Sequence, residues 1–133
     1  MTSTSPSHIL LASLDGARRQ IALQGEQLLS RTLRLALDVR EEIEQISGLR
    51  CITCEEAREL SDDFDPTKIL IDVSDVGVTG PEAEKWLREA CGVQVELATP
   101  RSVLAFITIG DTEESASRLV GALKRLPKEL GRM

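Results

Sequence analysis

Aromatic and histidine side chains are scarce in this 133-residue chain, which has two Phe, one Trp, no Tyr and one His. A Ser-His-Asp hydrolase would have to use His8, close to the chain end, and the count excludes a metal centre built from several histidines. Nucleic-acid modules that stack bases on aromatic rings are disfavoured, because they need several such rings. Composition alone therefore predicts an α+β protein without indicating its task.

Basic residues are outnumbered, with 16 Lys and Arg against 22 Asp and Glu, which gives a formal charge of −6. This excess of acid argues against nucleic acid and anionic membranes as partners, since both attract basic proteins. No apolar run approaches the roughly 20 residues that span a bilayer, and the first residues lack the basic segment of a secretory signal. Three cysteines cannot all pair internally, so we expect reduced thiols and a cytoplasmic protein.

The first third of the chain has the periodicity of one long helix. Ser5 and Pro6 form a helix-start pair, and apolar residues then recur at helical intervals as far as Ile46. A continuous helix from Pro6 to Ile46 would be about 60 Å long, and we expect any bend at Gly16 or Gly25. Four further leucines widen the apolar stripe and predict burial on more than one side: Leu11, Leu29, Leu33 and Leu37.

The rest of the chain changes to short strands and helices. Apolar alternation and apolar runs predict strands at 48–53, 68–74, 93–97 and 103–109. Helix-start signals at Thr79 and Asp111 predict two helices, the first ending at Gly92 and the second before Pro127. The order strand, strand, helix, strand, strand, helix predicts a small sheet covered by helices on one face.

The fold class that follows is α+β, with two units. Residues 1–48 are expected to form a long interdomain helix with an N-terminal hydroxyl cluster, and residues 49–133 a small α+β domain. An amphipathic helix of this length exceeds what a small sheet needs. Much of its apolar stripe therefore needs another partner, so the helix either dimerises or belongs to something larger.

Two local patterns could bind a ligand. Ser3, Thr4 and Ser5 place hydroxyls at the N-terminus of the predicted helix, where unpaired N–H groups and the helix dipole favour an anion such as phosphate. The alternative there is a simple helix cap. Glu96 lies on a predicted strand whose other face is apolar. It is either an exposed strand residue or a carboxylate at a cleft edge, suited to an ammonium group.

Cys51 and Cys54 form a C-x-x-C pair. Zinc needs four ligands, and the other candidate ligands stand at no recognisable spacing. A thioredoxin-like role needs the pair at a helix N-terminus after a strand. The alternatives are therefore a thiol or zinc protein and two thiols that only pack.

Six blocks of the sequence agree, in order, with one known family. They are residues 2–19 (TSTSPSHILLASLDGARR), 65–68 (DPTK), 76–80 (VGVTG), 82–88 (EAEKWLR), 92–97 (GVQVEL) and 108–112 (TIGDT). The first resembles the S-T-S-P-S-Y-x-L-x-A-S-L-D segment of the bacterial ornithine/lysine/arginine decarboxylases. These are pyridoxal-phosphate enzymes of the aspartate-aminotransferase fold, and the likeness extends to about Leu126.

The resemblance implies roles for particular residues. The chain would be the end of the large domain plus an aminotransferase-like small domain. Ser3, Thr4 and Ser5 would contact the phosphate of the cofactor across a dimer interface. Glu96 would line the mouth of the active site and hold the distal ammonium of the substrate, while His8 stands where the family usually has a tyrosine.

The resemblance also implies that this sequence lacks the Schiff-base lysine. In the family that lysine lies in a Ser-x-His-Lys motif before the S-T-S-P segment, and no lysine here stands in that context. A carboxy-lyase of amino-acid and polyamine metabolism would thus be inactive as this chain alone. Its partner would be the missing remainder of the decarboxylase or a second copy. The alternative is a non-catalytic α+β module that dimerises through the long helix.

Overall fold

A computed structural model describes residues 7–59 and 62–131. The elements run in the order α1 (His8–Glu44), β1 (Arg50–Cys51), α2 (Cys54–Arg58), β2 (Lys68–Asp72), the 3₁₀ turn η1 (Ser74–Val76), α3 (Gly80–Cys91), β3 (Leu97–Ala98), β4 (Ser102–Phe106) and α4 (Glu113–Glu129). Within this described part the strands form one antiparallel sheet in the order β1-β2-β4-β3. The predicted α+β class is therefore confirmed.

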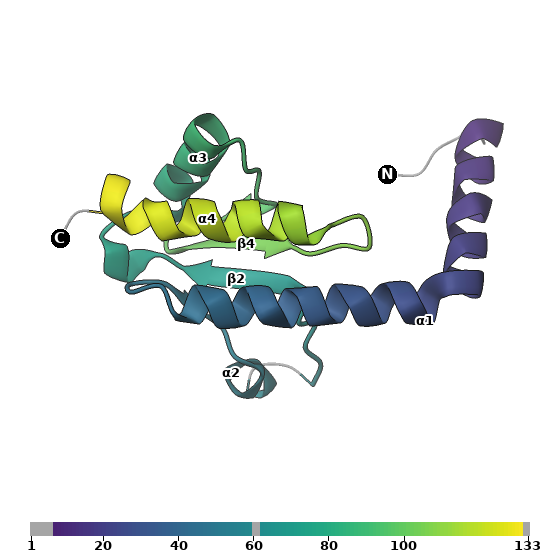
Figure 1. Ribbon diagram of the computed structural model, residues 1–133, viewed down its shortest axis with the longest axis horizontal. Helices are drawn as coiled ribbons and strands as arrows, with labels where there is room; N and C mark the ends of the chain where they lie inside the picture. The colour runs from purple at the N-terminus through teal and green to yellow at the C-terminus, as the bar shows by residue number, and fades with distance from the viewer. Residues whose placement is uncertain (1–6, 60–61, 132–133) are drawn as a thin grey trace.

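The sheet has one covered face and one open face. Strands β2 and β4 pair from Lys68 with Phe106 to Asp72 with Ser102. Side chains alternate between the faces of a strand, and the four that point to the covered face are buried: Ile69, Ile71, Val103 and Ala105. Helices α1 and α4 lie side by side over this face (Figure 1). The half-buried strand predicted for 68–74 is thus confirmed over Lys68–Asp72, whereas Ser74 begins the 3₁₀ turn.

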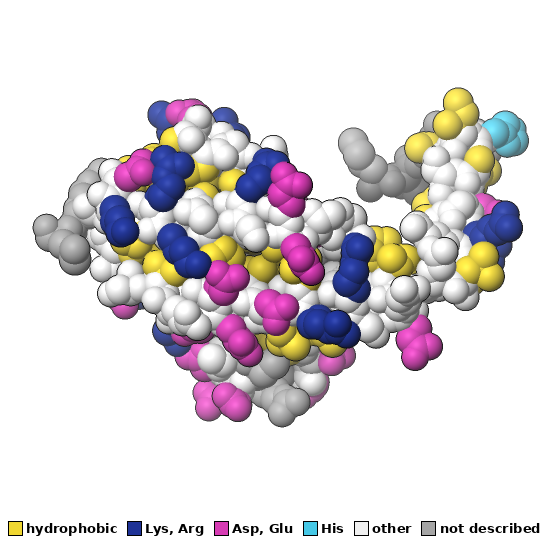
Figure 2. All heavy atoms as spheres, in the orientation of Figure 1, with side chains coloured by type: hydrophobic (Ala, Val, Ile, Leu, Met, Phe, Trp, Pro, Cys, Tyr) yellow, Lys and Arg dark blue, Asp and Glu magenta, His cyan; other side chains and the backbone are white. Residues whose placement is uncertain are grey.

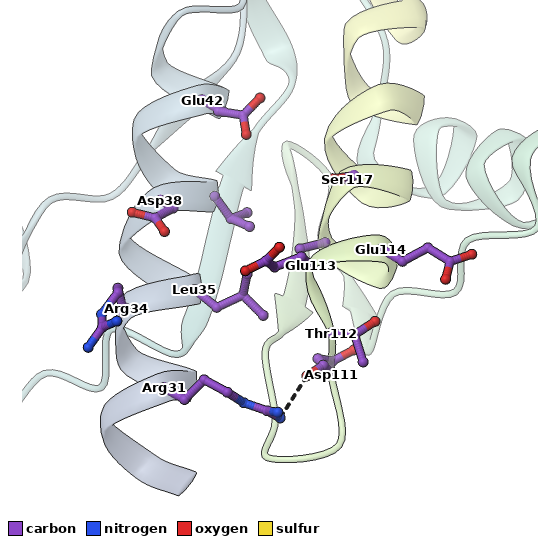
Figure 3. Close-up of a pocket in the computed structure, with 12 residues that line it drawn as sticks. Arg31, Arg34, Leu35, Asp38, Glu42, Asp111, Thr112, Glu113, Glu114 and Ser117 are labelled. Carbon is purple, nitrogen blue, oxygen red and sulfur yellow. Dashed lines mark hydrogen bonds between the residues drawn. The ribbon is translucent and has the colours of Figure 1, made fainter. Parts of the chain in front are cut away.

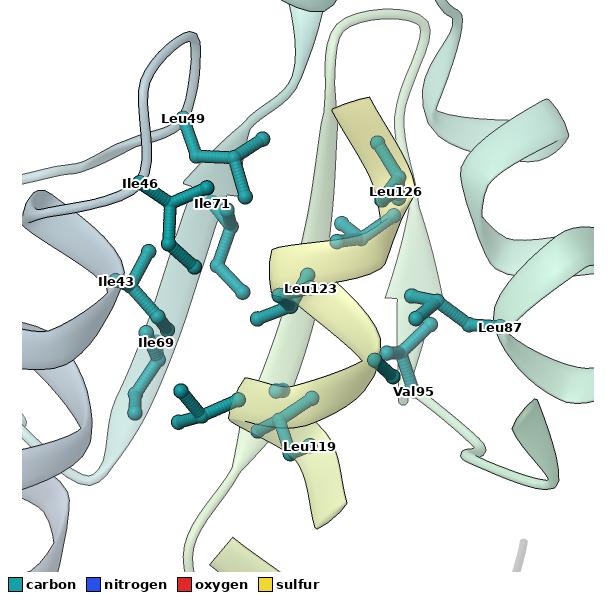
Figure 4. Packing of buried hydrophobic residues seen from close by; sticks show 14 of the residues in the cluster. Ile43, Ile46, Leu49, Ile69, Ile71, Leu87, Val95, Leu119, Leu123 and Leu126 are labelled. Atoms are coloured by element: carbon teal, nitrogen blue, oxygen red, sulfur yellow. The ribbon is translucent and has the colours of Figure 1, made fainter. Parts of the chain in front are cut away.

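The core joins the C-terminal half of α1 to the sheet and to α4. Ile43 of α1 and Leu123 of α4 are fully buried beside Ile69 and Ile71 of β2 (Figure 4). Burying a side chain of this size contributes about 1.5–3 kcal/mol. Leu87 brings α3 into the same cluster, so one continuous core runs through the chain from α1 to α4.

Helix α3 is set by local signals that the sequence predicts. The Thr79 hydroxyl accepts a hydrogen bond from the Glu82 N–H, and the Glu82 carboxylate accepts one from the Thr79 N–H at 2.8 Å. Gly92 ends the helix with φ of 63°, in the left-handed region. A side chain at Gly80 would meet the Thr99 and Ser102 carbonyl oxygens, since a Cβ there would lie 2.1 and 2.3 Å from them.

Three predicted boundaries are wrong. Helix α1 begins at His8, because Ser7 is the extended residue that caps it. Thr112, not Asp111, caps α4, because the Asp111 carboxylate accepts from the Thr108 N–H and hydroxyl instead. Pro127 lies inside α4 rather than after it, and the buried side chain of Leu126 keeps that last turn packed on the core.

The predicted strand at 93–97 is mostly irregular. The backbone bends at Glu96, and β3 comprises only Leu97 and Ala98. Val95 is buried, but Leu97 pairs with Leu104 on the open face and is 53% exposed. The expectation that Val95 and Leu97 share one face is therefore wrong, because the bend turns the chain between them.

Helix α1 is buried over only part of its length. Figure 1 shows it bending, so that its N-terminal part stands away from the sheet. Every residue from 8 to 24, here named the arm, is exposed, and Gly25 is the first buried residue. The prediction of burial on several sides is wrong for this chain by itself: Leu11, Leu29, Leu33 and Leu37 are 41–54% exposed.

Arg40 fastens the C-terminal half of α1 to the rest of the fold. The Arg40 guanidinium donates to the carbonyl oxygens of Pro66 (2.9 Å), Ile52 (2.9 Å) and Lys68 (2.7 Å). Its carbon also lies 5.0 Å from the centroid of the Phe64 ring, a cation–π contact. Arg40 therefore joins α1 to the first residue of β2 and to both ends of the segment that connects β1 with β2.

Candidate functional site

Glu96 lies at the bend just before β3. Its N–H donates to the Leu104 carbonyl oxygen at 2.8 Å, so its backbone is held against β4 although it is outside the strand. Its side chain is exposed. Among the described residues the carboxylate has no hydrogen-bond or ion-pair partner, in contrast to Asp72, which lies 3.8 Å from Arg101. A fixed backbone with a free carboxylate can receive a cation from outside this chain.

The open face of the sheet beside Glu96 carries apolar side chains. Leu97 of β3 and Phe106 of β4 are 53% and 39% exposed, and Leu104, which pairs with Leu97, is half-buried. Lys68 on the neighbouring strand lies 5.7 Å from the centroid of the Phe106 ring. An apolar surface with one unpaired carboxylate at its margin suits a ligand that has an aliphatic stem and a positive end.

The N-terminus of α1 has the character of an anion site without showing a ligand. The Ser7 hydroxyl accepts from the Leu10 N–H at 3.5 Å, and the first turn contains no acidic residue. Ser3, Thr4 and Ser5 lie outside the described residues. Their predicted contact with a phosphate group therefore stays a prediction, and the arm that carries them stands apart from the sheet (Figure 1).

A polar hollow separates α1 from the start of α4 (Figure 3). Arg31 crosses it and donates to the carbonyl oxygens of Ile109 (2.9 Å) and Asp111 (3.0 Å). Burial by itself would raise the pKa of Asp111, but hydrogen bonds from Thr108 and Ser115 outweigh it and hold that pKa below its usual value. These contacts lie within the fold and hold no external ligand. The sequence did not indicate Arg31, because no local pattern marks an arginine whose acceptors are carbonyl oxygens about 80 residues away in the chain.

The C-x-x-C pair falls on β1 and the first residue of α2. Cys51 is buried, and burial raises the pKa of its thiol to about 12. A thiol with so high a pKa is protonated at neutral pH and is a poor nucleophile or metal ligand. Among residues 7–59 and 62–131, no group of three or more His, Cys, Asp or Glu side chains is arranged to hold a metal ion.

All four lysines of the chain lie in the described part, and all are exposed: Lys68, Lys85, Lys124 and Lys128. Lys124 pairs with Glu42 at 2.8 Å and Lys68 lies 3.9 Å from Asp65. None is enclosed in a cavity that would favour its neutral, nucleophilic form. In the described residues, no helix combines the length and the apolar character needed to cross a membrane.

Comparison with known proteins identifies the family. The model of the family described as "Orn/Lys/Arg decarboxylase, major domain" matches residues 1–115. An arginine decarboxylase of Bacillus subtilis is 41% identical over 131 residues, which are 98% of this chain and 27% of that protein. An arginine decarboxylase of Bacillus cereus is 44% identical over 127 residues, or 95% of this chain and 28% of that protein. The chain thus spans about a quarter of these relatives.

Solved structures agree with the sequence comparison. The lysine decarboxylase of Francisella novicida matches with a TM-score of 0.76 and 28% identity, over 96% of this chain and 22% of that one. The constitutive lysine decarboxylase of E. coli shares the fold, with a TM-score of 0.72 at 22% identity over 96% of this chain and 23% of that one. This chain belongs to the Orn/Lys/Arg decarboxylase family and represents part of such a protein's length.

Proposed function

We propose that this chain is the small-domain portion of a pyridoxal-phosphate-dependent decarboxylase of arginine, lysine or ornithine. Glu96 binds the distal positive group of the substrate, and Ser3, Thr4 and Ser5 bind the phosphate of the cofactor. The family match over residues 1–115, which contains all four of these residues, carries the proposal. The role of Glu96 is supported by its exposed carboxylate, which has no partner among residues 7–59 and 62–131.

The N-terminus of α1 fits the phosphate of the cofactor chemically. Its first turn offers unpaired N–H groups, the positive end of a 37-residue helix and no acidic side chain that would repel an anion. When bound, pyridoxal phosphate supplies the electron sink for loss of carbon dioxide. The hydroxyls of this chain would orient the phosphate, because each can donate a hydrogen bond to it without adding charge.

Glu96 fits the distal end of a basic amino acid. Arginine, lysine and ornithine each combine an aliphatic stem with a positive end group. The apolar side chains of Leu97 and Phe106 lie close to the bend that carries the carboxylate. An ionic hydrogen bond to Glu96 would select a basic substrate, whereas the stem would contact the apolar surface. The chain's own role is thus to bind and position the substrate.

This chain by itself is expected to be catalytically inactive. Its four lysines are exposed, and none lies in a Ser-x-His-Lys context. The purified chain mixed with pyridoxal phosphate should show no absorbance band of a bound cofactor. It should release no carbon dioxide from arginine, lysine or ornithine. Measurable turnover by the chain alone would contradict the proposal.

A chimera tests the role of Glu96. The matching segment of the Bacillus subtilis relative is replaced by this chain, and decarboxylation of the three basic amino acids is measured. Glu96→Gln should lower kcat/KM for the preferred substrate at least about tenfold, since one ionic hydrogen bond is lost. Glu89→Gln, which changes an exposed residue on α3, is the control and should keep the kcat/KM of the unmodified chimera. Equal kcat/KM in both variants would exclude Glu96 from substrate binding.

A further inference from the structure

Helix α3 and the hairpin of β3 and β4 approach each other at Gly80 more closely than a side chain would allow. A Cβ at Gly80 would lie 2.1 Å from the Thr99 carbonyl oxygen and 2.3 Å from that of Ser102. Both oxygens belong to the backbone, so they cannot rotate aside as the end of a flexible side chain can. The Gly80 N–H also donates to the Pro100 carbonyl oxygen at 3.2 Å. Residues 99–102, here named the hairpin turn, therefore contact the first residue of α3 directly.

At Gly80 it is the missing side chain that matters, and not a positive φ. In the described residues positive φ occurs at Gly48, Gly77 and Gly92, and Gly80 is not among them. Gly121 of α4 gives the contrast, because it is exposed and a Cβ there would meet nothing within 4 Å. Glycine at position 80 thus acts through the space that it leaves, which lets α3 reach the hairpin turn.

The hairpin turn is also fixed to the end of β2. The Val73 N–H donates to the Arg101 carbonyl oxygen at 2.9 Å, and the Arg101 guanidinium donates to the Ser74 hydroxyl at 3.1 Å. Within the turn, the Thr99 hydroxyl accepts from the Ser102 N–H at 3.1 Å. The turn is therefore held by β2 and by α3 together, so it has one position relative to both.

Glu96 lies in a segment that α3 contacts at both of its ends. At the first end, the Val93 N–H donates to the Leu87 carbonyl oxygen at 2.9 Å, and the side chains of Leu87 and Val95 are buried in the same core (Figure 4). At the other end, Thr99 belongs to the hairpin turn that contacts the start of α3. The position of the bend at Glu96 is therefore set by how closely α3 meets the turn.

Helix α3 acts as one rigid element with a single contact side. Gly80 and Leu87 are buried on its inner side, whereas its outer side presents acidic and basic side chains to the solvent (Figure 2). Arg88 and Glu84 of this helix pair at 2.9 Å. Because a helix of 12 residues keeps its length, a displacement at Gly80 moves either the hairpin turn or the whole helix. Either movement displaces the segment that carries Glu96.

We infer that Gly80 is a positioning residue for the Glu96 carboxylate, because its lack of a side chain lets α3 seat against the hairpin turn and fix the bend. This inference deepens the proposed function and rests on it, since Gly80 acts through Glu96 and not on the substrate. A methyl group at position 80 would require the two carbonyl oxygens to retreat by about 1 Å. A shift of that size in a binding group is enough to lower the rate about tenfold or more.

The chimera described above tests this with Gly80→Ala. The value of kcat/KM for the preferred basic amino acid should fall about tenfold or more, mainly through a higher KM, because a displaced Glu96 holds the substrate less well. The absorbance band of the bound cofactor should stay unchanged. Gly121→Ala is the matched control, because it adds the same methyl group at an exposed site. It should keep the kcat/KM of the unmodified chimera.

A double-mutant cycle separates positioning from general damage to the fold. If Gly80 acts through Glu96, adding Gly80→Ala to Glu96→Gln should lower kcat/KM by less than about twofold further. The loss should persist when Pro81→Ala is added to Gly80→Ala, since this removes any clash between the new methyl group and the proline ring. Fully additive losses in the cycle, recovery through Pro81→Ala, or no loss from Gly80→Ala would each overturn the inference.

Thr99 provides a second variant in case Gly80→Ala does not fold. Thr99→Val keeps the shape of the side chain but removes the hydroxyl that accepts from the Ser102 N–H. It should lower kcat/KM about threefold or more because the hairpin turn is loosened, and Thr99→Ser should restore it. Unchanged kcat/KM in Thr99→Val would overturn the inference while leaving the role of Glu96 intact. Unchanged kcat/KM in Glu96→Gln would instead refute the proposed function, and this inference with it.

Discussion

Removal of the Arg40 side chain should destabilise the fold more than any other single change on the polar side of α1. Its bonds to the Pro66 and Ile52 carbonyl oxygens are partly buried, and its bond to Lys68 is exposed. Water can replace the exposed hydrogen bond. Each of the two partly buried hydrogen bonds has a charged donor and contributes about 1.5 kcal/mol, the lower end of the usual range for such bonds. Arg40→Ala should therefore cost about 3 kcal/mol.

Urea and thermal unfolding of the 133-residue chain would measure this loss. For a chain of this size, about 3 kcal/mol corresponds to a fall in Tm of about 10 °C. Arg40→Lys should lose about half as much, because a single ammonium group cannot reach both partly buried carbonyls in the geometry of a guanidinium. The fall should appear as a lower urea midpoint with an unchanged slope.

Arg34→Ala is the matched control on the same helix. The Arg34 side chain is exposed and has no hydrogen bond or ion pair among the described residues. Its replacement should change stability by less than about 0.5 kcal/mol. If Arg40→Ala falls within that same margin, Arg40 does not hold α1 to the sheet, and the assignment of its three hydrogen bonds is wrong.

Three further predictions concern the core, the thiols and pH. Leu123→Ala should lower the free energy of unfolding by about 3 kcal/mol because Leu123 is fully buried. Gly121→Ala in the same helix should raise it by about 0.5–1 kcal/mol. Urea unfolding measures both variants, and similar free energies of unfolding would contradict the packing. In single-cysteine variants, Cys51 should react with a thiol reagent at pH 8 far more slowly than Cys91, since burial raises the pKa of the Cys51 thiol to about 12. Equal reaction rates would contradict the burial of Cys51. The lowered pKa of Asp111 stabilises the fold above the ordinary value of about 4. That contribution should disappear as pH falls through the lower folded value, and Asp111→Asn should flatten this loss in acid-unfolding curves; an unchanged slope would contradict it.

The family could be identified from the sequence, but the site could be predicted only through that resemblance. Local patterns left Glu96 open between an exposed strand residue and a ligand-binding carboxylate, and Ser3, Thr4 and Ser5 between a cap and a phosphate site. Glu96 is exposed at a bend rather than within a strand, and its carboxylate has no partner in the part of the chain that the structure describes. Arg31 and Arg40 carried no sequence signal, because their acceptors are backbone carbonyls that come near only after folding.

The sequence by itself determined the elements whose causes are local. Thr79 and Glu82 cap α3 across three residues, Gly92 ends it, and the alternation from Lys68 to Asp72 gives β2. These signals act through hydrogen bonds and steric limits within a few residues, so no distant part of the chain can override them easily. Only the tertiary structure decided which apolar residues are buried. Leu10 and Val39 belong to the same predicted stripe, yet one is exposed and the other lies in the core. Burial depends on whether another element packs against that stretch of helix. A periodic pattern of apolar residues indicates that a helix face needs a packing partner, but it does not show which part of the helix has one.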